Sequence, residues 1–243
     1  MKKYIILILI AVISGCKKPD NVTIDQVISG LTISNKAPNA DGTTIVYISA
    51  QLNTKADADK RSIIFESSAG LFNKANDTLI TQPATFVNGA LVATVALKVP
   101  ITAGEIYISA KPATATQYKD FILKDSINAV RSIPATLMLT PSSFGIKSNY
   151  GNEVALTATL KNSLNNNVST GTKVLFEDYY PGGQPVNGQF RALRDTTDAT
   201  STATAAFSFG AITGPTTFYI KCTYLDHGGK TAIKDSCLIT ITQ

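Results

Sequence analysis

Apolar and polar side chains alternate along many short segments of this chain. In the segment from 45 to 52, one face is formed by Val46, Ile48, Ala50 and Leu52. The same alternation returns in 91–97 and 154–160, and turn-forming Gly, Pro, Asn and Asp separate the segments. Because successive side chains of a strand point to opposite faces, the pattern predicts half-buried β-strands. Many such strands in series predict an all-β sandwich or barrel.

Three short segments occur twice, in the same order and about 110 residues apart. The segments at 63–66, 106–108 and 123–127 return at 174–177, 218–220 and 233–237. An internal repeat of this kind predicts two copies of one sandwich, residues 27–131 and 132–243, rather than one large domain. The join at 129–135 contains Pro134 and no Gly-Ser tract, so we expect the copies to stand end to end with limited bending.

The first residues have the layout of an export signal. Lys2 and Lys3 are basic, the segment 4–13 is apolar, and Ser14 and Gly15 are small. The apolar part is about a dozen residues long, whereas a membrane-spanning helix needs roughly 20. We therefore predict a cleaved signal peptide at 1–15, not a transmembrane helix, and a polar tether at 16–26.

The segment Ile13-Ser14-Gly15-Cys16 resembles the lipobox of bacterial lipoproteins. The resemblance implies that Cys16 becomes the lipidated N-terminus and that the chain is held on a membrane through this lipid. Lys17, in place of an aspartate, implies sorting to the outer membrane, facing either the periplasm or the outside. The alternative is an ordinary signal peptide with a cysteine at the cut.

Charge and composition exclude several classes of partner. Removing Lys2 and Lys3 with the leader lowers the formal net charge from +5 to +3. No run of Lys and Arg is interleaved with aromatic residues, so we expect no nucleic-acid partner.

The sequence contains neither a nucleophile elbow nor a zinc-protease helix, and it has a single histidine. We expect no enzyme activity, no metal site and no cofactor.

Several motifs resemble the bacterial immunoglobulin-like repeat (Big-1 type) of the invasin and intimin adhesins. In the first copy they are Ala40-Asp41-Gly42 before a strand, Ile64-Phe65, and Gly89-Ala90-Leu91-Val92-Ala93. The second copy matches more loosely, with Gly151-Asn152 and Val174-Leu175-Phe176. The resemblance implies two tandem immunoglobulin-like β-sandwiches. These motifs are turn and core features, so they indicate fold rather than a ligand.

Cys222 and Cys237 form an even pair in an exported chain, where disulfides can persist. If the predicted hairpin turned between Gly229 and Lys230, the two cysteines would lie directly opposite each other. In the first copy the repeat places Ala110 and Ile127 at these positions. The pair is then a disulfide replacing an apolar contact, or it is two free buried thiols.

The segment 178–189, Asp-Tyr-Tyr-Pro-Gly-Gly-Gln-Pro-Val-Asn-Gly-Gln, is much longer than its counterpart 67–71. Loops on a rigid sandwich are where recognition is usually placed. Tyr179 and Tyr180, with Gln184 and Asn187, form the candidate binding loop, since tyrosine offers amphipathic surface to a sugar or a protein. The alternative is that one tyrosine folds back over the sandwich.

These observations predict a membrane-anchored, non-enzymatic spacer, scaffold or adhesion module of the cell envelope. The alternative is an accessory glycan-binding lipoprotein that uses the Tyr179-Tyr180 loop. In both cases a protein or glycan partner would bind at the end far from the membrane.

Overall fold

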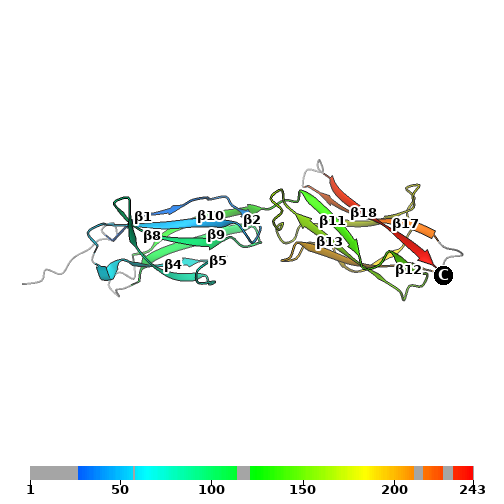
Figure 1. Ribbon diagram of the computed structural model, residues 1–243, viewed down its shortest axis with the longest axis horizontal. Coiled ribbons are helices and arrows are strands. Elements are labelled where there is room, and N and C mark those ends of the chain that lie inside the picture. Colours follow the sequence, from blue (N-terminus) through cyan, green and yellow to red (C-terminus); the bar gives the residue numbers. More distant parts are fainter. Residues whose placement is uncertain (1–26, 57, 114–120, 211–215, 227–231, 243) are drawn as a thin grey trace, which may run out of the picture.

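The computed structural model describes residues 27–56, 58–113, 121–210, 216–226 and 232–242. Figure 1 shows two β-sandwiches in line along the long axis of the molecule. The predicted leader 1–15, Cys16 and the tether 16–26 lie outside the described residues, as does the predicted turn at Gly229 and Lys230. No helix among the described residues is long and apolar enough to cross a membrane.

Two five-stranded sheets form the first sandwich. One contains β1 (Ile28–Ile33), β3 (Ile45–Leu52), β8 (Ala90–Lys98) and β5 (Leu71–Phe72) in that order, with β7 (Thr85–Val87) also paired to β8. The other has the order β2 (Asn39–Ala40), β10 (Leu123–Arg131), β9 (Gly104–Pro112), β4 (Ser62–Ser67) and β6 (Leu79–Pro83). A short 3-10 turn, Ala58–Lys60, precedes β4.

The second sandwich repeats this arrangement with two four-stranded sheets. One has the order β11 (Thr136–Pro141), β13 (Val154–Lys161), β16 (Thr202–Ser208) and β15 (Gln189–Arg194). The other has the order β12 (Gly145–Lys147), β18 (Ala232–Thr242), β17 (Thr216–Leu225) and β14 (Leu175–Tyr179). In each sandwich a short parallel strand, β2 or β12, pairs with the last strand. The strands β4, β9 and β10 thus correspond to β14, β17 and β18.

Each sandwich has its own hydrophobic core, built from the alternating faces that the sequence predicts. Val46, Ile48, Ala50 and Leu52 of β3 are buried while their neighbours are partly or fully exposed, and β8 and β13 follow the same rule. The second core is centred on Phe207, whose ring lies 5.2 Å from that of Phe190 and 5.1 Å from that of Phe218. The predicted all-β fold of two immunoglobulin-like sandwiches is confirmed.

Candidate functional site

A buried serine, Ser169, forms hydrogen bonds across the junction between the two sandwiches. The Ser169 hydroxyl donates a hydrogen bond to the carbonyl of Ala40 in the first sandwich, at 2.7 Å, and accepts one from the Ser132 amide at 2.9 Å. The Ser169 amide in turn donates to the Ser132 carbonyl at 3.1 Å. Ser169 and Ser132 are 1% and 2% exposed. Water therefore cannot replace these hydrogen bonds of the two serines.

Next to this serine, Asp41 of the motif Ala40-Asp41-Gly42 forms a hydrogen bond with the second sandwich. The Asp41 carboxylate accepts hydrogen bonds from the Thr43 and Thr44 amides, at 2.8 and 2.7 Å, and from both threonine hydroxyls. It also accepts one from the Asn166 side chain across the junction, at 3.3 Å. Burial by itself raises the pKa of Asp41, but the threonine hydrogen bonds outweigh it and lower this pKa below its ordinary 3.8.

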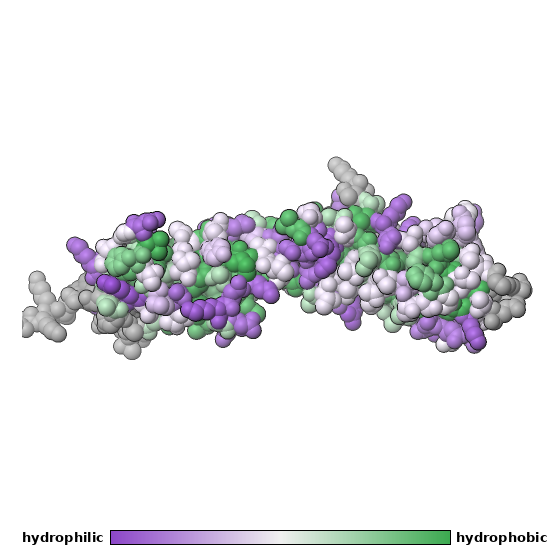
Figure 2. Space-filling model, in the orientation of Figure 1, coloured by the Kyte–Doolittle hydropathy of each residue, from purple (hydrophilic) through white to green (hydrophobic). Residues whose placement is uncertain are grey.

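Further polar contacts surround this centre. The Thr102 and Thr170 hydroxyls are 3.0 Å apart, the Thr170 amide donates to the Ile101 carbonyl at 3.2 Å, and the Arg131 guanidinium donates to the Gly171 carbonyl at 3.1 Å. Figure 2 shows hydrophilic residues gathered near the middle of the molecule, beside the junction. The two sandwiches are therefore connected by several directional bonds and not only by the chain.

The candidate binding loop after β14 is a closed structure with defined backbone bonds. The Tyr180 amide donates to the Gln184 carbonyl and the Gly183 amide donates to the Tyr180 carbonyl, both at 2.8 Å. The Gly188 amide donates to the Asp178 carboxylate at 2.6 Å, and Val186 is buried in the core of the second sandwich. The loop is thus fixed at both ends.

The four predicted residues of this loop do not form one site. Tyr180 packs against the core, which corresponds to the alternative of a tyrosine folded back over the sandwich. Gln184 and Asn187 are exposed, and Asn187 adopts a φ of 60° that serves the turn. Only Tyr179 lines a hollow of about 420 Å³ on the outer face of the sheet, together with Glu177, Asp178, Gly183, Pro185, Lys221 and Lys234.

Sequence reasoning missed the partners of Tyr179. Its ring stacks on that of Tyr219 with a centroid distance of 5.4 Å, and the Lys221 ammonium lies 5.5 Å from the Tyr179 ring centre. The same ammonium forms an ion pair of 2.7 Å with Glu177. The available signal was that Tyr219 and Glu177 both lie in repeated segments, at strand positions that point outward.

The predicted alignment of Cys222 with Cys237 is wrong. Cys222 lies opposite Asp235, and Cys237 lies opposite Ile220, so the two cysteines are diagonal neighbours. Diagonal Cα atoms are about 7–8 Å apart, beyond the usual 4.4–6.8 Å span of a disulfide, and both thiols are free and buried. Burial raises the pKa of Cys222 to about 12 and that of Cys237 to about 11, with Asp235 adding to both shifts.

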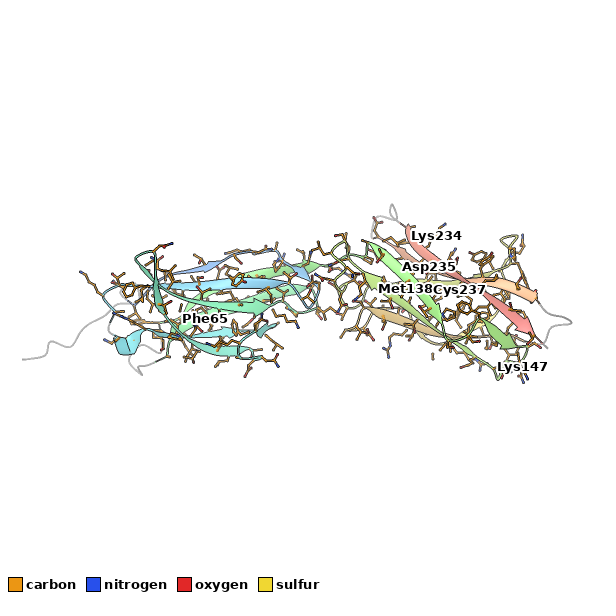
Figure 3. All side chains as sticks on the ribbon, in the orientation of Figure 1. Phe65, Met138, Lys147, Lys234, Asp235 and Cys237 are labelled. Atoms are coloured by element: carbon orange, nitrogen blue, oxygen red, sulfur yellow. The ribbon has the colours of Figure 1, made fainter. Side chains whose placement is uncertain are left out.

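The counterparts of the two cysteines in the first sandwich, Ala110 and Ile127, do not lie opposite each other either. Ala110 lies opposite Leu123, and Ile127 lies opposite Ile106, so this pair is not an apolar contact across the hairpin. Asp235 has another role, because its carboxylate accepts a hydrogen bond from the Leu139 amide of β11 at 2.8 Å and joins β18 to the opposite sheet (Figure 3).

Within the described parts of the chain, no three His, Cys, Asp or Glu side chains come together as metal ligands.

Two solved structures have a fold similar to that of this chain. The chain is similar to invasin, a bacterial integrin-binding protein, with a TM-score of 0.60 and 15% identity over 87% of this chain and 38% of that one. It is also similar to the adhesin InvE of Yersinia pseudotuberculosis, with a TM-score of 0.50 and 16% identity over 89% of this chain and 60% of that one. This chain thus spans less than two thirds of either. No protein-family model and no curated protein sequence matches it.

Proposed function

We propose that this protein is a non-enzymatic spacer of the cell envelope that holds its second sandwich away from a membrane for adhesion or scaffolding. The observation that carries the proposal is the junction, where Ser169 connects the sandwiches through a buried hydrogen bond and Asp41 through a part-buried one. A flexible linker would let the second sandwich turn freely, whereas directional bonds hold it in one orientation. The likeness of the fold to adhesin structures supports the same role.

The rigidity of the junction can be measured by NMR residual dipolar couplings. In the natural chain we expect one alignment tensor to fit both sandwiches. The double change Ser169→Ala and Asn166→Ala removes two of the hydrogen bonds that cross the junction, so the fit of one tensor to both sandwiches should become worse. Its local cost should be about 1–3 kcal/mol, because the Ser132 amide loses its buried acceptor.

The exposed residue Ser163, on the same connection between β13 and β14, gives the matched control. Ser163→Ala should leave a single tensor. If the natural chain already required two independent tensors, the spacer would not be rigid and the proposal would be wrong.

The membrane anchor is the second part of the proposal. The lipobox-like segment Ile13-Ser14-Gly15-Cys16 supports lipid attachment at Cys16 and outer-membrane localisation. We expect the natural protein to partition into detergent and to carry the mass of the attached acyl chains. Cys16→Ser should abolish both properties, and an unlipidated natural protein that still stayed with the membrane would contradict the anchor. Protease treatment of intact cells then distinguishes a surface-facing rod, which is cleaved, from a periplasmic one.

A further inference from the structure

Two positions on the free edge of strand β11 cannot donate a hydrogen bond to a further strand. The Ser142 amide, directly after β11, donates to the Ala155 carbonyl of β13 at 2.8 Å. Because hydrogen-bonded and non-hydrogen-bonded pairs alternate along an antiparallel ladder, the main-chain groups of Leu139 and Pro141 point away from β13. The Leu139 amide donates to the Asp235 carboxylate at 2.8 Å, and Pro141 has no N–H. This part of the edge is therefore protected.

The corresponding positions of β1 are open. The Ser34 amide, directly after β1, donates to the Tyr47 carbonyl of β3 at 2.9 Å. The same alternation therefore directs the main-chain groups of Leu31 and Ile33 away from β3. Ile33, which precedes the serine as Pro141 does in the second sandwich, keeps its N–H.

The carboxylate that protects β11 has no counterpart in the first sandwich. The Asn128 amide of β10 donates to the loop that follows β1 at 2.8 Å, and the Thr240 amide of β18 donates in the same way to the loop that follows β11 at 2.9 Å. Leu123 precedes Asn128 by as many residues as Asp235 precedes Thr240, so the two correspond. A leucine side chain accepts no hydrogen bond, and within the described parts of the chain no side chain bonds to either open amide of β1.

The remaining edge strands of the described sheets are protected in other ways. β2, β5, β7 and β12 have only two or three residues each. β6 ends at Pro83, and both β14 and β15 carry charged side chains. β1 has six residues with neither a charge nor a proline, and its bulge lies at its start, before the two open positions. An open, neutral strand edge is a template for another extended chain.

We infer that β1 pairs with β1 of a second copy of this chain, antiparallel and about a two-fold axis at Thr32. Leu31 of each copy then lies opposite Ile33 of the other, and the N–H and C=O groups of both residues bond across the axis. Both side chains are partly buried against the first core, so the pairing also extends this core between the copies. The edge is thus complementary to itself, and no charge in β1 opposes the pairing.

The orientation of the pair follows from the direction of β1. The strands of the first sandwich run along the long axis of the molecule (Figure 1), so two copies paired in this way point in opposite directions. Chains that project from two facing membranes would meet in this orientation, which suits an adhesive role. The inference goes beyond the proposed function, because it names the partner and the surface that binds it.

Oxidative cross-linking of the full chain at Thr32 tests the pairing. Thr32 is exposed, and the axis places it opposite Thr32 of the other copy in a non-hydrogen-bonded pair, where Cα atoms are about 4.5 Å apart and a disulfide can form. Thr32→Cys should give a disulfide-linked dimer on a non-reducing gel. Thr140→Cys, at the corresponding exposed position of β11, is the matched control and should stay monomeric, as should the natural chain.

Transferring the protection of β11 to β1 should abolish the pairing. Ile33→Pro copies Pro141, and Leu123→Asp copies Asp235. The two changes together should lower both the cross-linked fraction of Thr32→Cys and the association constant measured by sedimentation equilibrium at least about tenfold. The Ile33 amide is not used in pairing with β3, so Ile33→Pro alone should leave the melting temperature nearly unchanged, and thermal unfolding of each variant reports whether it is folded.

The reverse change, Pro141→Ile with Asp235→Leu, should open β11, so that Thr140→Cys then also cross-links. A natural chain that stays monomeric at every concentration, cross-linking that survives the protective changes, or equal cross-linking of Thr32→Cys and Thr140→Cys would overturn the inference. A monomeric chain that captures an extended peptide on β1 would also overturn it. None of these results would change the dipolar-coupling test of the junction, so the two proposals fail separately.

Discussion

Replacing Gly188 with alanine should lower the free energy of unfolding of the second sandwich by about 3 kcal/mol. A Cβ atom at this position would overlap the ring of Phe207 and lie 2.9 Å from the Asp178 carboxylate. Phe207 is fully buried between the rings of Phe190 and Phe218, so it has no space into which to move. The added methyl group must therefore displace the loop or break the aromatic core.

Differential scanning calorimetry can measure this effect. A loss of about 3 kcal/mol should lower the melting temperature of the second sandwich by more than about 10 °C. Gly182 lies in the same loop, and a Cβ there would have no neighbour within 4 Å. Gly182→Ala should therefore change little. Equal melting temperatures for the two variants would mean that Gly188 does not pack against Phe207 as described.

Replacing Asp41 with alanine should destabilise the first sandwich by about 3 kcal/mol and loosen the junction. Asp41 is fully buried, and the change removes the charged acceptor of two part-buried hydrogen bonds from the Thr43 and Thr44 amides, each worth about 1.5–3 kcal/mol. It also removes the acceptor of the Asn166 side chain in the second sandwich. Asp77→Ala is the control, because Asp77 likewise accepts the amide of a following threonine but is exposed.

The contribution of Asp41 should also depend on pH. Its pKa is lowered on folding, so the carboxylate stabilises the folded state above the ordinary value of 3.8, and this stabilisation is lost as pH falls through the lower folded pKa. Urea unfolding between about pH 7 and pH 2 should show a gap between the natural chain and Asp41→Asn that closes in acid. A gap that stayed constant to the lowest pH would contradict the role assigned to the charge.

The sequence predicted the strand faces well because burial leaves a direct trace in it. Val46, Ile48, Ala50 and Leu52 alternate with polar residues, and only one face of a sandwich strand can be buried. The repeat at 63–66 and 174–177 indicated β4 and β14 in the same way, since Phe65 and Phe176 are core residues of the two sandwiches.

The candidate site was predicted only in part. The long segment 178–189 pointed to Tyr179, but its other predicted residues do not lie beside this tyrosine in one site. Tyr180 packs against the core, and Gln184 is exposed. The stack depends on Tyr219, which lies 40 residues further along and reaches Tyr179 only through the pairing of β17 with β14. No local pattern contains that pairing.

The sequence by itself determined that the chain forms two similar all-β sandwiches and which side chains of each strand face the core. Only the tertiary structure decided the register of β17 and β18, where the alignment expected from the predicted turn is off by two residues and Cys222 does not meet Cys237. Side chains alternate with a period of two, so a shift of two residues keeps every side chain on its face and leaves no trace in the pattern. The junction was decided in the same way, because Asp41 and Asn166 are far apart in the chain and become neighbours only when both sandwiches have folded.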